Sequence, residues 1–202
     1  PPPPSPLLPP PPAITTSLGC SNTCSDHGSN QHSDPHHSHA NDGICDDGGP
    51  GAQSGGCSLG ADCGDCGTRD TFSAVTDPHT YDDAHNACRE QLGGSLASIL
   101  TAAENAIVLS LITGEAWIGL NRANTTQSWS WIDRTSSLAY TNWVSGEPQS
   151  HETCTRMRTS GEWAAVPPST CTTEKAFVCR VPAPPSPPSP PFPPLPSPPP
   201  PP

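Results

Sequence analysis

The side chains of this chain that could do chemistry together lie close to residue 150. The stretch GEPQSHETC, residues 146–154, sets the carboxylates of Glu147 and Glu152 and the amide of Gln149 around Pro148. Calcium takes six to eight oxygen ligands at roughly 2.3–2.6 Å, and carboxylate and amide oxygens are among its usual protein ligands. Two acids and an amide within six residues therefore predict the beginning of a calcium cage, of a kind that could hold a sugar.

Catalytic chemistry is not indicated anywhere along the chain. The sequence contains no nucleophile elbow, no metal-protease helix and no phosphate loop. The histidines nearest to predicted elements, His79, His85 and His151, have no evident catalytic partner. We expect a binding or structural protein and not an enzyme.

Charge and cysteine content limit the partners and the compartment. The formal net charge is −11, with 19 acidic and 8 basic residues, so the chain does not attract nucleic acid phosphates. Ten cysteines, an even number, predict disulfides and therefore an oxidising, extracellular compartment. The longest apolar run, residues 106–112, is too short to span a bilayer. We interpret the chain as a segment of a longer secreted protein or ectodomain.

Two helices and several short strands must position these side chains. Thr80 and Thr101 are the predicted N-caps of helices over residues 81–92 and 102–113, which end at Gly93 and Gly114. Short β-like runs follow, and a long irregular stretch separates residues 133 and 153. The runs are residues 116–120, 128–133, 153–157, 162–166 and 176–181. This order predicts an α+β domain over residues 68–181.

Residues 68–181 resemble the C-type lectin-like domain over its whole length. The similarity rests on motifs that follow one another in this order along the chain: GGSLASI at 93–99, WIGL at 117–120, WSWID at 129–133, YTNW at 140–143, GEPQ at 146–149, ETC at 152–154, GEW at 161–163 and FVC at 177–179. The resemblance implies an α+β fold with two helices, small antiparallel sheets and a long loop. It also implies disulfides Cys88–Cys179 and Cys154–Cys171, and core positions for Trp117 and Leu120.

The same resemblance implies a calcium and carbohydrate site on the long loop. Its members use an acid-Pro-amide triplet, matched by Glu147-Pro148-Gln149 with a cis proline, and a glutamate before the loop cysteine, matched by Glu152. An Asn-Asp pair after the strand tryptophan, Trp163, completes the ligand set. Here that pair is Ala164-Ala165, which offers no side-chain oxygen, so calcium is a possible cofactor only. Trp143 and Trp163 are the candidates for stacking on a sugar, with core packing as the alternative.

Residues 20–67 form a cysteine-rich acidic module with almost no large apolar residues, so disulfides must replace a core. The module resembles small calcium-binding repeats of Notch type in its cysteine and aspartate pattern. Candidate metal ligands are Asn41, Asp46, Asp62 and Asp65, and solvated acidic turns are the alternative. The Cys63-x-x-Cys66 pair also suggests zinc, although disulfides are favoured in an oxidising compartment.

Proline dominates both ends, with nine prolines in residues 1–12 and fifteen in residues 182–202. We expect residues 1–19 and 182–202 to be linkers, disordered or in polyproline II. Their Ser-Pro-Pro composition resembles hydroxyproline-rich wall glycoproteins of plants and green algae. Asn124 begins a glycosylation sequon. The predicted function is a carbohydrate-binding module of an extracellular or wall-associated glycoprotein, with a glycan or matrix glycoprotein as partner. A calcium-independent protein-interaction or structural module is the alternative.

Overall fold

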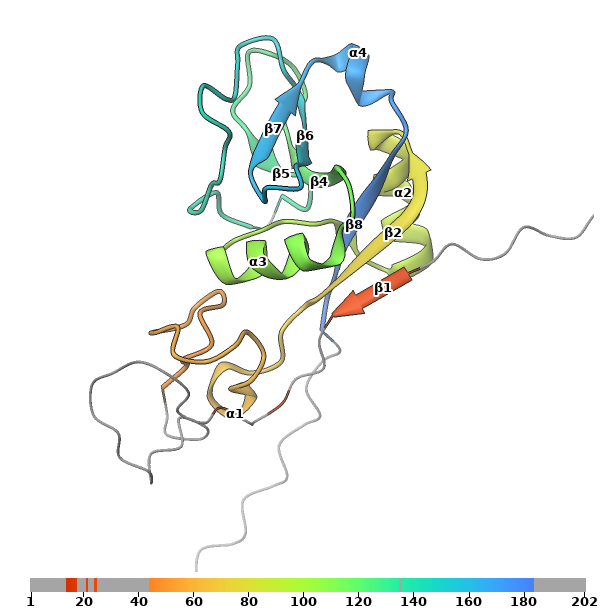
Figure 1. The fold of residues 1–202 in the computed structure, drawn as a ribbon. Helices are drawn as coiled ribbons and strands as arrows, with labels where there is room; N and C mark the ends of the chain where they lie inside the picture. The colour runs from red at the N-terminus through yellow and green to blue at the C-terminus, as the bar shows by residue number, and fades with distance from the viewer. Residues whose placement is uncertain (1–13, 18–20, 22–23, 25–43, 135, 184–202) are drawn as a thin grey trace, which may run out of the picture.

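The computed structural model describes residues 14–17, 21, 24, 44–134 and 136–183. Most of the two expected proline linkers, and the candidate ligand Asn41, lie outside the described residues. Figure 1 shows the arrangement of the remaining elements, with a disulfide-rich segment below a larger domain of helices and strands.

In the described part of the chain, eight strands form one sheet, ordered β1-β2-β8-β4-β6-β7, with β3 paired to β8 and β5 to β4. Every described pairing is antiparallel except that of β4 with β8, which is parallel. The strands are β1 Ile14–Ser17, β2 Thr71–His79, β3 Ser95–Leu96, β4 Ala116–Asn121, β5 Ser130–Trp131, β6 Cys154–Met157, β7 Trp163–Val166 and β8 Lys175–Val181. The expected small sheets are therefore continuous, because β8 lies between β2 and β4.

Two longer helices form as predicted, α2 at Tyr81–Leu92 and α3 at Ala102–Leu111, although α3 ends two residues before the predicted end and its C-cap is Ile112. The hydroxyl oxygens of Thr80 and Thr101 accept hydrogen bonds from backbone N–H groups in the first turns, which satisfies donors that a helix start leaves free. Gly93 ends α2 in the left-handed region at φ 68°. The remaining helices are single turns, α1 at Cys63–Cys66 and α4 at Pro168–Cys171.

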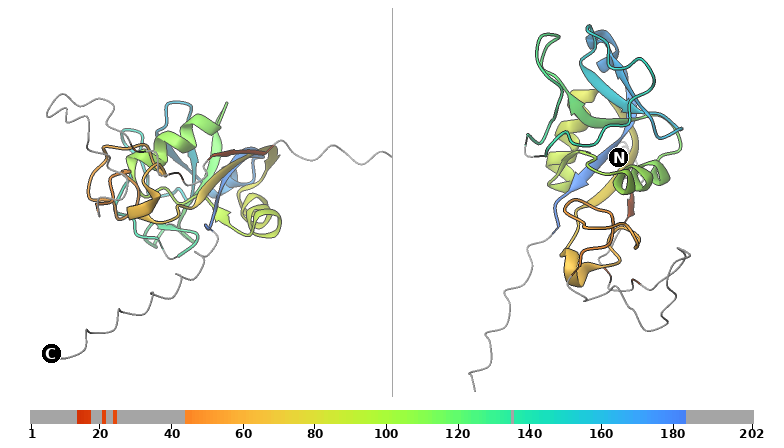
Figure 2. Two further views of the ribbon diagram at one scale, coloured as in Figure 1. Left: turned by 90° about the horizontal axis from the view of Figure 1, so that it is seen from below. Right: turned by 90° about the vertical axis from the view of Figure 1, so that its left-hand side faces the viewer.

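The two longer helices cover opposite faces of the β2–β8 pair (Figure 2). On the α3 side, Val108 packs with Phe72, Ile118 and Met157 in one buried apolar cluster. On the α2 side, a second cluster contains Tyr81, Ala84, Val75, Trp117 and Phe177. A strand buried on both faces has no alternation of apolar and polar residues, which is why the sequence did not predict β2.

One strand departs from the expected domain boundaries. Residues Ile14–Ser17 lie within the segment predicted as an N-terminal linker, yet they form β1 and pair with β2 from Ile14↔Val75 to Ser17↔Phe72. The prediction of a linker through residue 19 is therefore wrong for these four residues. A backbone partner far along the chain decides their conformation, and composition does not reveal it.

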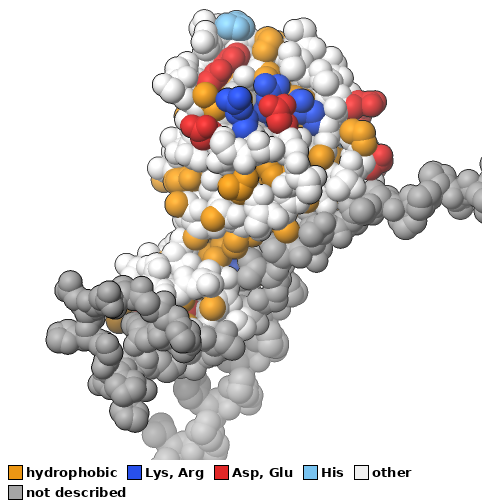
Figure 3. Space-filling model, in the orientation of Figure 1, with side chains coloured by type: hydrophobic (Ala, Val, Ile, Leu, Met, Phe, Trp, Pro, Cys, Tyr) orange, Lys and Arg blue, Asp and Glu red, His pale blue; other side chains and the backbone are white. Residues whose placement is uncertain are grey.

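On the face shown in Figure 3, the surface over α3 differs in character from the surface over β6 and β7. Charged side chains gather over β6 and β7 in Figure 3, and none is visible over α3. The only charged residue of α3, Glu104, is buried at 3% exposure and pairs with Arg180 at 3.2 Å. Within the described part of the chain, no helix is long and apolar enough to cross a membrane.

Candidate functional site on the long loop

The acid-Pro-amide triplet lies on the long loop between β5 and β6, and its Glu147–Pro148 bond is cis, as expected. Glu152 is 6% exposed, and its Oε2 accepts a hydrogen bond from the backbone N–H of Gln149 at 2.6 Å. Burial and the neighbouring Glu152 carboxyl raise the pKa of Glu147 to about 7. Glu147 Oε2 is buried without a hydrogen-bond partner. The structure therefore brings both predicted acids together and leaves one of their oxygens unsatisfied.

Arg122, in the loop that follows β4, is hydrogen-bonded to the backbone of this part of the long loop. Its Nε donates to the carbonyl oxygen of Glu152 at 2.5 Å, and its Nη2 donates to that of Gln149 at 2.7 Å. The guanidinium also lies over the ring of Trp129, 5.1 Å from the centroid. Arg122 is not among the site residues that the sequence predicts. An arginine directly after the buried WIGL strand was the signal available.

The donor set is incomplete where the sequence indicated. Ala164 and Ala165 are buried in β7, opposite Arg156 and Thr155 of β6. Their methyl groups contribute no oxygen, and the Glu152 carboxylate already accepts a backbone N–H. Calcium needs six to eight oxygens. The residues present therefore do not fit the full calcium cage that the family resemblance implies.

Trp163 is not available to a sugar. Its side chain is fully buried, its Nε1 donates to Asn105 Oδ1 at 2.8 Å, and its ring packs edge-to-face on Trp131 at 5.5 Å. The prediction that Trp163 belongs to the binding site is therefore wrong, and the alternative of core packing is correct. Trp143 is only partly buried, and it contacts both Trp163 and Trp129.

The other expectations for the domain core are confirmed. Trp117 and Leu120 are fully buried. Disulfides join Cys88 to Cys179 and Cys154 to Cys171, as the resemblance implied. The first links α2 to β8, and the second fixes the start of β6, where the long loop ends, to α4. The loop is thus anchored covalently a few residues after the triplet.

In the cysteine-rich module the structure singles out an aspartate that the sequence did not. Asp47 is fully buried and accepts hydrogen bonds from Arg69 Nε and Nη2 at 2.9 and 2.6 Å, and from the backbone N–H groups of Gly49 and Gly60 at 3.0 and 2.9 Å. Burial acts to raise its pKa, but Arg69 and the two backbone donors outweigh burial and lower it. Asp47 therefore has a structural role.

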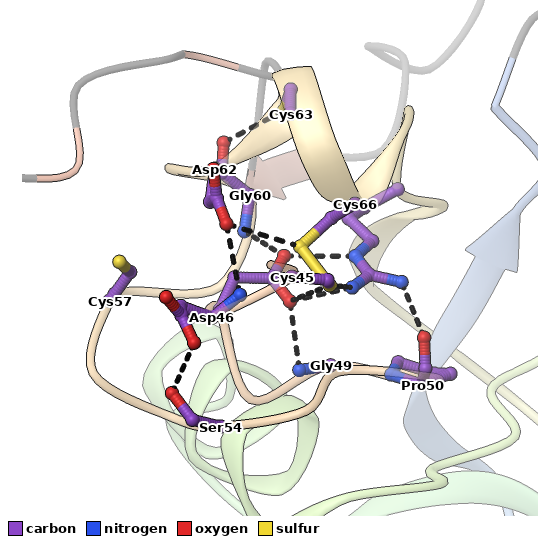
Figure 4. The surroundings of a disulfide bond; sticks show 12 residues. Cys45, Asp46, Gly49, Pro50, Ser54, Cys57, Gly60, Asp62, Cys63 and Cys66 are labelled. Carbon is purple, nitrogen blue, oxygen red and sulfur yellow. Dashed lines mark hydrogen bonds and ion pairs between the residues drawn. A yellow bond between two sulfur atoms is a disulfide. The ribbon is translucent and has the colours of Figure 1, made fainter. Parts of the chain in front are cut away.

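The predicted ligands of this module are only partly brought together (Figure 4). Asp62 Oδ2 accepts the backbone N–H of Asp46 at 2.9 Å, and the Ser54 hydroxyl donates to Asp46 Oδ1. Asp62 is fully buried, and its Oδ1 has no hydrogen-bond partner. Asp65 lies in α1, partly buried. The structure thus leaves one buried carboxylate oxygen free for a cation.

Zinc has no site at the cysteines of the described module. Cys45 pairs with Cys66, Cys24 pairs with Cys57, and Cys63 is also disulfide-bonded. Cys45, Cys66 and Asp47 lie close enough together that their side chains resemble the ligands of a single metal ion. However, a disulfide sulfur is not a thiolate, and the Asp47 carboxylate is already satisfied. The alternative of zinc at Cys63-x-x-Cys66 is therefore wrong.

The sequon at Asn124 lies on an exposed turn after β4. Asn124 Oδ1 accepts hydrogen bonds from the backbone N–H and the hydroxyl of Thr126, at 3.0 and 2.6 Å. Its Nδ2, the atom that glycosylation modifies, makes no hydrogen bond in the described part of the chain. The geometry is compatible with the predicted modification.

Comparison with known proteins agrees with this architecture. The family model for the lectin C-type domain matches residues 77–181. The chain is 32% identical over 118 residues to the alpha-N-acetylgalactosamine-specific lectin of Patiria pectinifera. The matched region covers 50% of this chain and 68% of that lectin. It is 40% identical over 91 residues to human C-type mannose receptor 2, which covers 42% of this chain but 6% of the receptor.

A solved structure of a calcium-independent type II antifreeze protein is also similar. It superimposes with a TM-score of 0.50 at 26% sequence identity and covers 55% of this chain and 85% of that chain.

Proposed function

Since the chain belongs to the C-type lectin domain family, we propose that residues 68–181 form a carbohydrate-binding module with its site on the long loop. The observation that carries this proposal is the meeting of Glu147 and Glu152 beside the exposed side chain of Gln149. The exposed Gln149 amide and the partly buried Glu147 carboxyl offer acceptors, and the amide also a donor, to sugar hydroxyls. The role is one of binding and not of catalysis.

We further propose that this binding does not depend on calcium. Ala164 and Ala165 remove two side-chain ligands, and Arg122 supplies a fixed positive charge that holds the carbonyl groups of Gln149 and Glu152 in place. The loop is thus positioned by an internal cation. Similarity to a calcium-independent antifreeze protein is in keeping with this proposal.

A glycan array probed with and without a chelator tests both proposals. We expect the same glycans to be bound under both conditions. Gln149→Ala should reduce binding, whereas Gln91→Ala, an exposed glutamine on α2, should not. Binding that disappears with chelator would contradict calcium independence, and equal binding by both variants would contradict the site.

The alternative is a protein-interaction module of the extracellular matrix that uses the same fold. The two alanines favour it, because they remove the groups through which related lectins hold both calcium and sugar. An array on which no glycan is bound with or without calcium supports this alternative. Retention of a matrix protein by the immobilised chain, lost on substitution in the long loop, then identifies its partner.

The setting that we propose is extracellular, in a matrix or wall glycoprotein. Its support is the set of disulfides in both modules and the Ser-Pro-Pro composition of the ends. Expression with a secretion signal should yield a chain without free thiols, whereas reducing cytosolic expression should yield an unstable one. Equal yields of folded protein from both compartments would contradict the proposal.

Calcium in the cysteine-rich module is a separate proposal. Asp46 and Asp62 would hold the ion, and the support is the buried, unpartnered Oδ1 of Asp62. Calorimetric titration of the whole chain with calcium should give a heat that Asp62→Asn abolishes and Asp77→Asn, an exposed aspartate on β2, does not. No heat at several millimolar calcium would leave Asp62 as a purely structural residue.

A further inference from the structure

A pocket of about 490 Å³ lies beside the long loop but outside the proposed glycan site. It is bounded by the first turn of α2, the loop after β4, the start of β6 and α4, whose ribbons can be followed in Figure 1. None of the residues 147–152 of the proposed glycan site lines it. Its volume falls within the range of about 300–1,000 Å³ that is usual for small-molecule sites.

The pocket contains a positive charge that no acid of the described chain neutralises. Arg122 lines it, and among the described residues its hydrogen bonds go only to carbonyl oxygens, those of Glu152, Thr125 and Gln149. Asp82 is the one carboxylate in the lining, and it forms no ion pair with Arg122. What distinguishes Arg122 from the other arginines without a described ion pair is its place in the lining of a pocket.

Arg122 retains N–H donors that a carboxylate can accept. A guanidinium has five N–H donors, and three of them are used in the described contacts. One N–H on Nη1 and one on Nη2 are left. A pair of donors on the two terminal nitrogens suits bidentate binding of a carboxylate, the strongest common pairing of this group. Trp129, under the guanidinium plane, helps to fix its orientation.

The rest of the lining suits a sugar ring. The amide of Asn121 and the hydroxyl of Thr125 make no side-chain hydrogen bond among the described residues and can bind ring hydroxyls. Pro168 and the Cys154–Cys171 disulfide supply apolar surface, against which the C–H face of a sugar can pack. A carboxylate alone would not use these groups.

We propose that this pocket binds an acidic saccharide, a uronic acid residue, with its carboxylate on Arg122 and its ring hydroxyls on Asn121 and Thr125. The pocket and the long-loop site share Arg122 but no other residue, so variants of their remaining residues tell them apart. It takes a different chemistry, because an anion replaces the neutral diol that the long loop would recognise.

The test is a titration of the whole chain, in the presence of chelator, followed by nuclear magnetic resonance. The probes are D-glucuronate and D-galacturonate, with glucose, galactose and acetate for comparison. We expect at least one uronate to bind about tenfold more tightly than its neutral parent and than acetate, because a charge-assisted pair and the ring contacts act together. Shifts should centre on residues 121–125 and 168–172. Equal affinity for acetate, or no shift there, overturns the proposal.

Variants locate the site. Arg122→Gln should lose uronate binding by about tenfold or more, but it also releases the long loop. Ala123→Trp therefore serves as a second variant, because Ala123 is exposed, lines the pocket and can block it without removing a bond of Arg122. Arg158→Gln, which removes an exposed arginine outside the pocket, is the matched control. Unchanged uronate binding by the Ala123 variant contradicts the site.

Two further comparisons separate this pocket from its surroundings. Gln149→Ala should keep uronate binding even where it abolishes glycan-array binding, and loss of both would assign the uronate to the long loop. Asn124 also lines the pocket, so the glycosylated chain is compared with Thr126→Ala, which removes the sequon outside the lining. Weaker uronate binding by the glycosylated form places the ligand beside Asn124, whereas identical binding by a fully glycosylated form argues against this pocket.

Discussion

Asp47 in the cysteine-rich module is a fully buried acid and Glu147 on the long loop a partly buried one, and the two have opposite surroundings. Asp47 receives four N–H donors, two of them from Arg69, and its pKa is lowered. Burial and the Glu152 carboxyl raise the pKa of Glu147 to about 7, and its Oε2 has no donor. The first acid is satisfied by the fold itself.

This difference indicates which carboxylates of an acidic chain remain available to bind a ligand. A carboxylate whose hydrogen-bond capacity is filled by its own protein has nothing to offer a ligand. A carboxylate held beside another one costs stability, and it persists only where other contacts hold the loop in place. Here Arg122 and the Cys154–Cys171 disulfide provide those contacts.

Removing the Asp47 charge should have the largest effect. Asp47→Asn leaves Arg69, whose side chain is 12% exposed, without its ion pair, at an expected cost of about 3 kcal/mol. Hydrogen exchange at the amides of Gly49 and Gly60, which donate to Asp47, should become about 100-fold faster. Asp77→Asn is the control, since Asp77 is exposed. Unchanged protection of both glycines would show that the disulfides alone hold this module.

Adding the missing oxygens should convert the long loop into a metal site. Ala164→Asn with Ala165→Asp should raise calcium affinity at least about tenfold, because affinity grows with ligand charge. Both positions are buried, so we expect the metal-free variant to melt at a lower temperature and calcium to restore it. The control variant carries Ala102→Asn and Ala106→Asp, which add the same two side chains on the exposed face of α3 and should leave calcium affinity unchanged. An unchanged calcium affinity in calorimetry would mean that the acids do not converge.

Neutralising Glu147 should have the smallest effect and the opposite sign to that at Asp47. The folded pKa, about 7, lies above the ordinary value of 4.5, so the charge weakens the fold as pH rises from 4.5 through 7. Glu147→Gln should therefore stabilise the domain at pH 8 by on the order of 1 kcal/mol and have little effect near pH 4. Thermal unfolding across this range, with chelator present and Glu174→Gln as control, measures the difference. A constant difference at all pH values would contradict the raised pKa.

Local patterns predicted the parts of the fold that depend on neighbouring residues. Thr80 and Thr101 cap α2 and α3 as expected, because capping joins residues three positions apart. The strands β4, β6, β7 and β8 lie within about one residue of the predicted runs. In contrast, β2 pairs with β1 near the start of the chain and with β8 far towards its end, and neither β1 nor β2 shows a period of its own.

The sequence by itself determined the identities available for binding: the acid-Pro-amide triplet, Glu152, and the alanines at 164 and 165 in place of oxygen ligands. Only the tertiary structure decided which of these side chains meet. In the fold, Trp163 is buried and hydrogen-bonded to Asn105, and the Asp47 carboxylate accepts hydrogen bonds from Arg69. The fold also places Arg122 beside the carbonyl groups of Gln149 and Glu152. The physical reason is that burial and hydrogen-bond satisfaction depend on contacts between distant residues. The sequence specifies the type of each side chain, whereas the tertiary structure determines whether that side chain is exposed and has hydrogen-bonding groups left for a ligand.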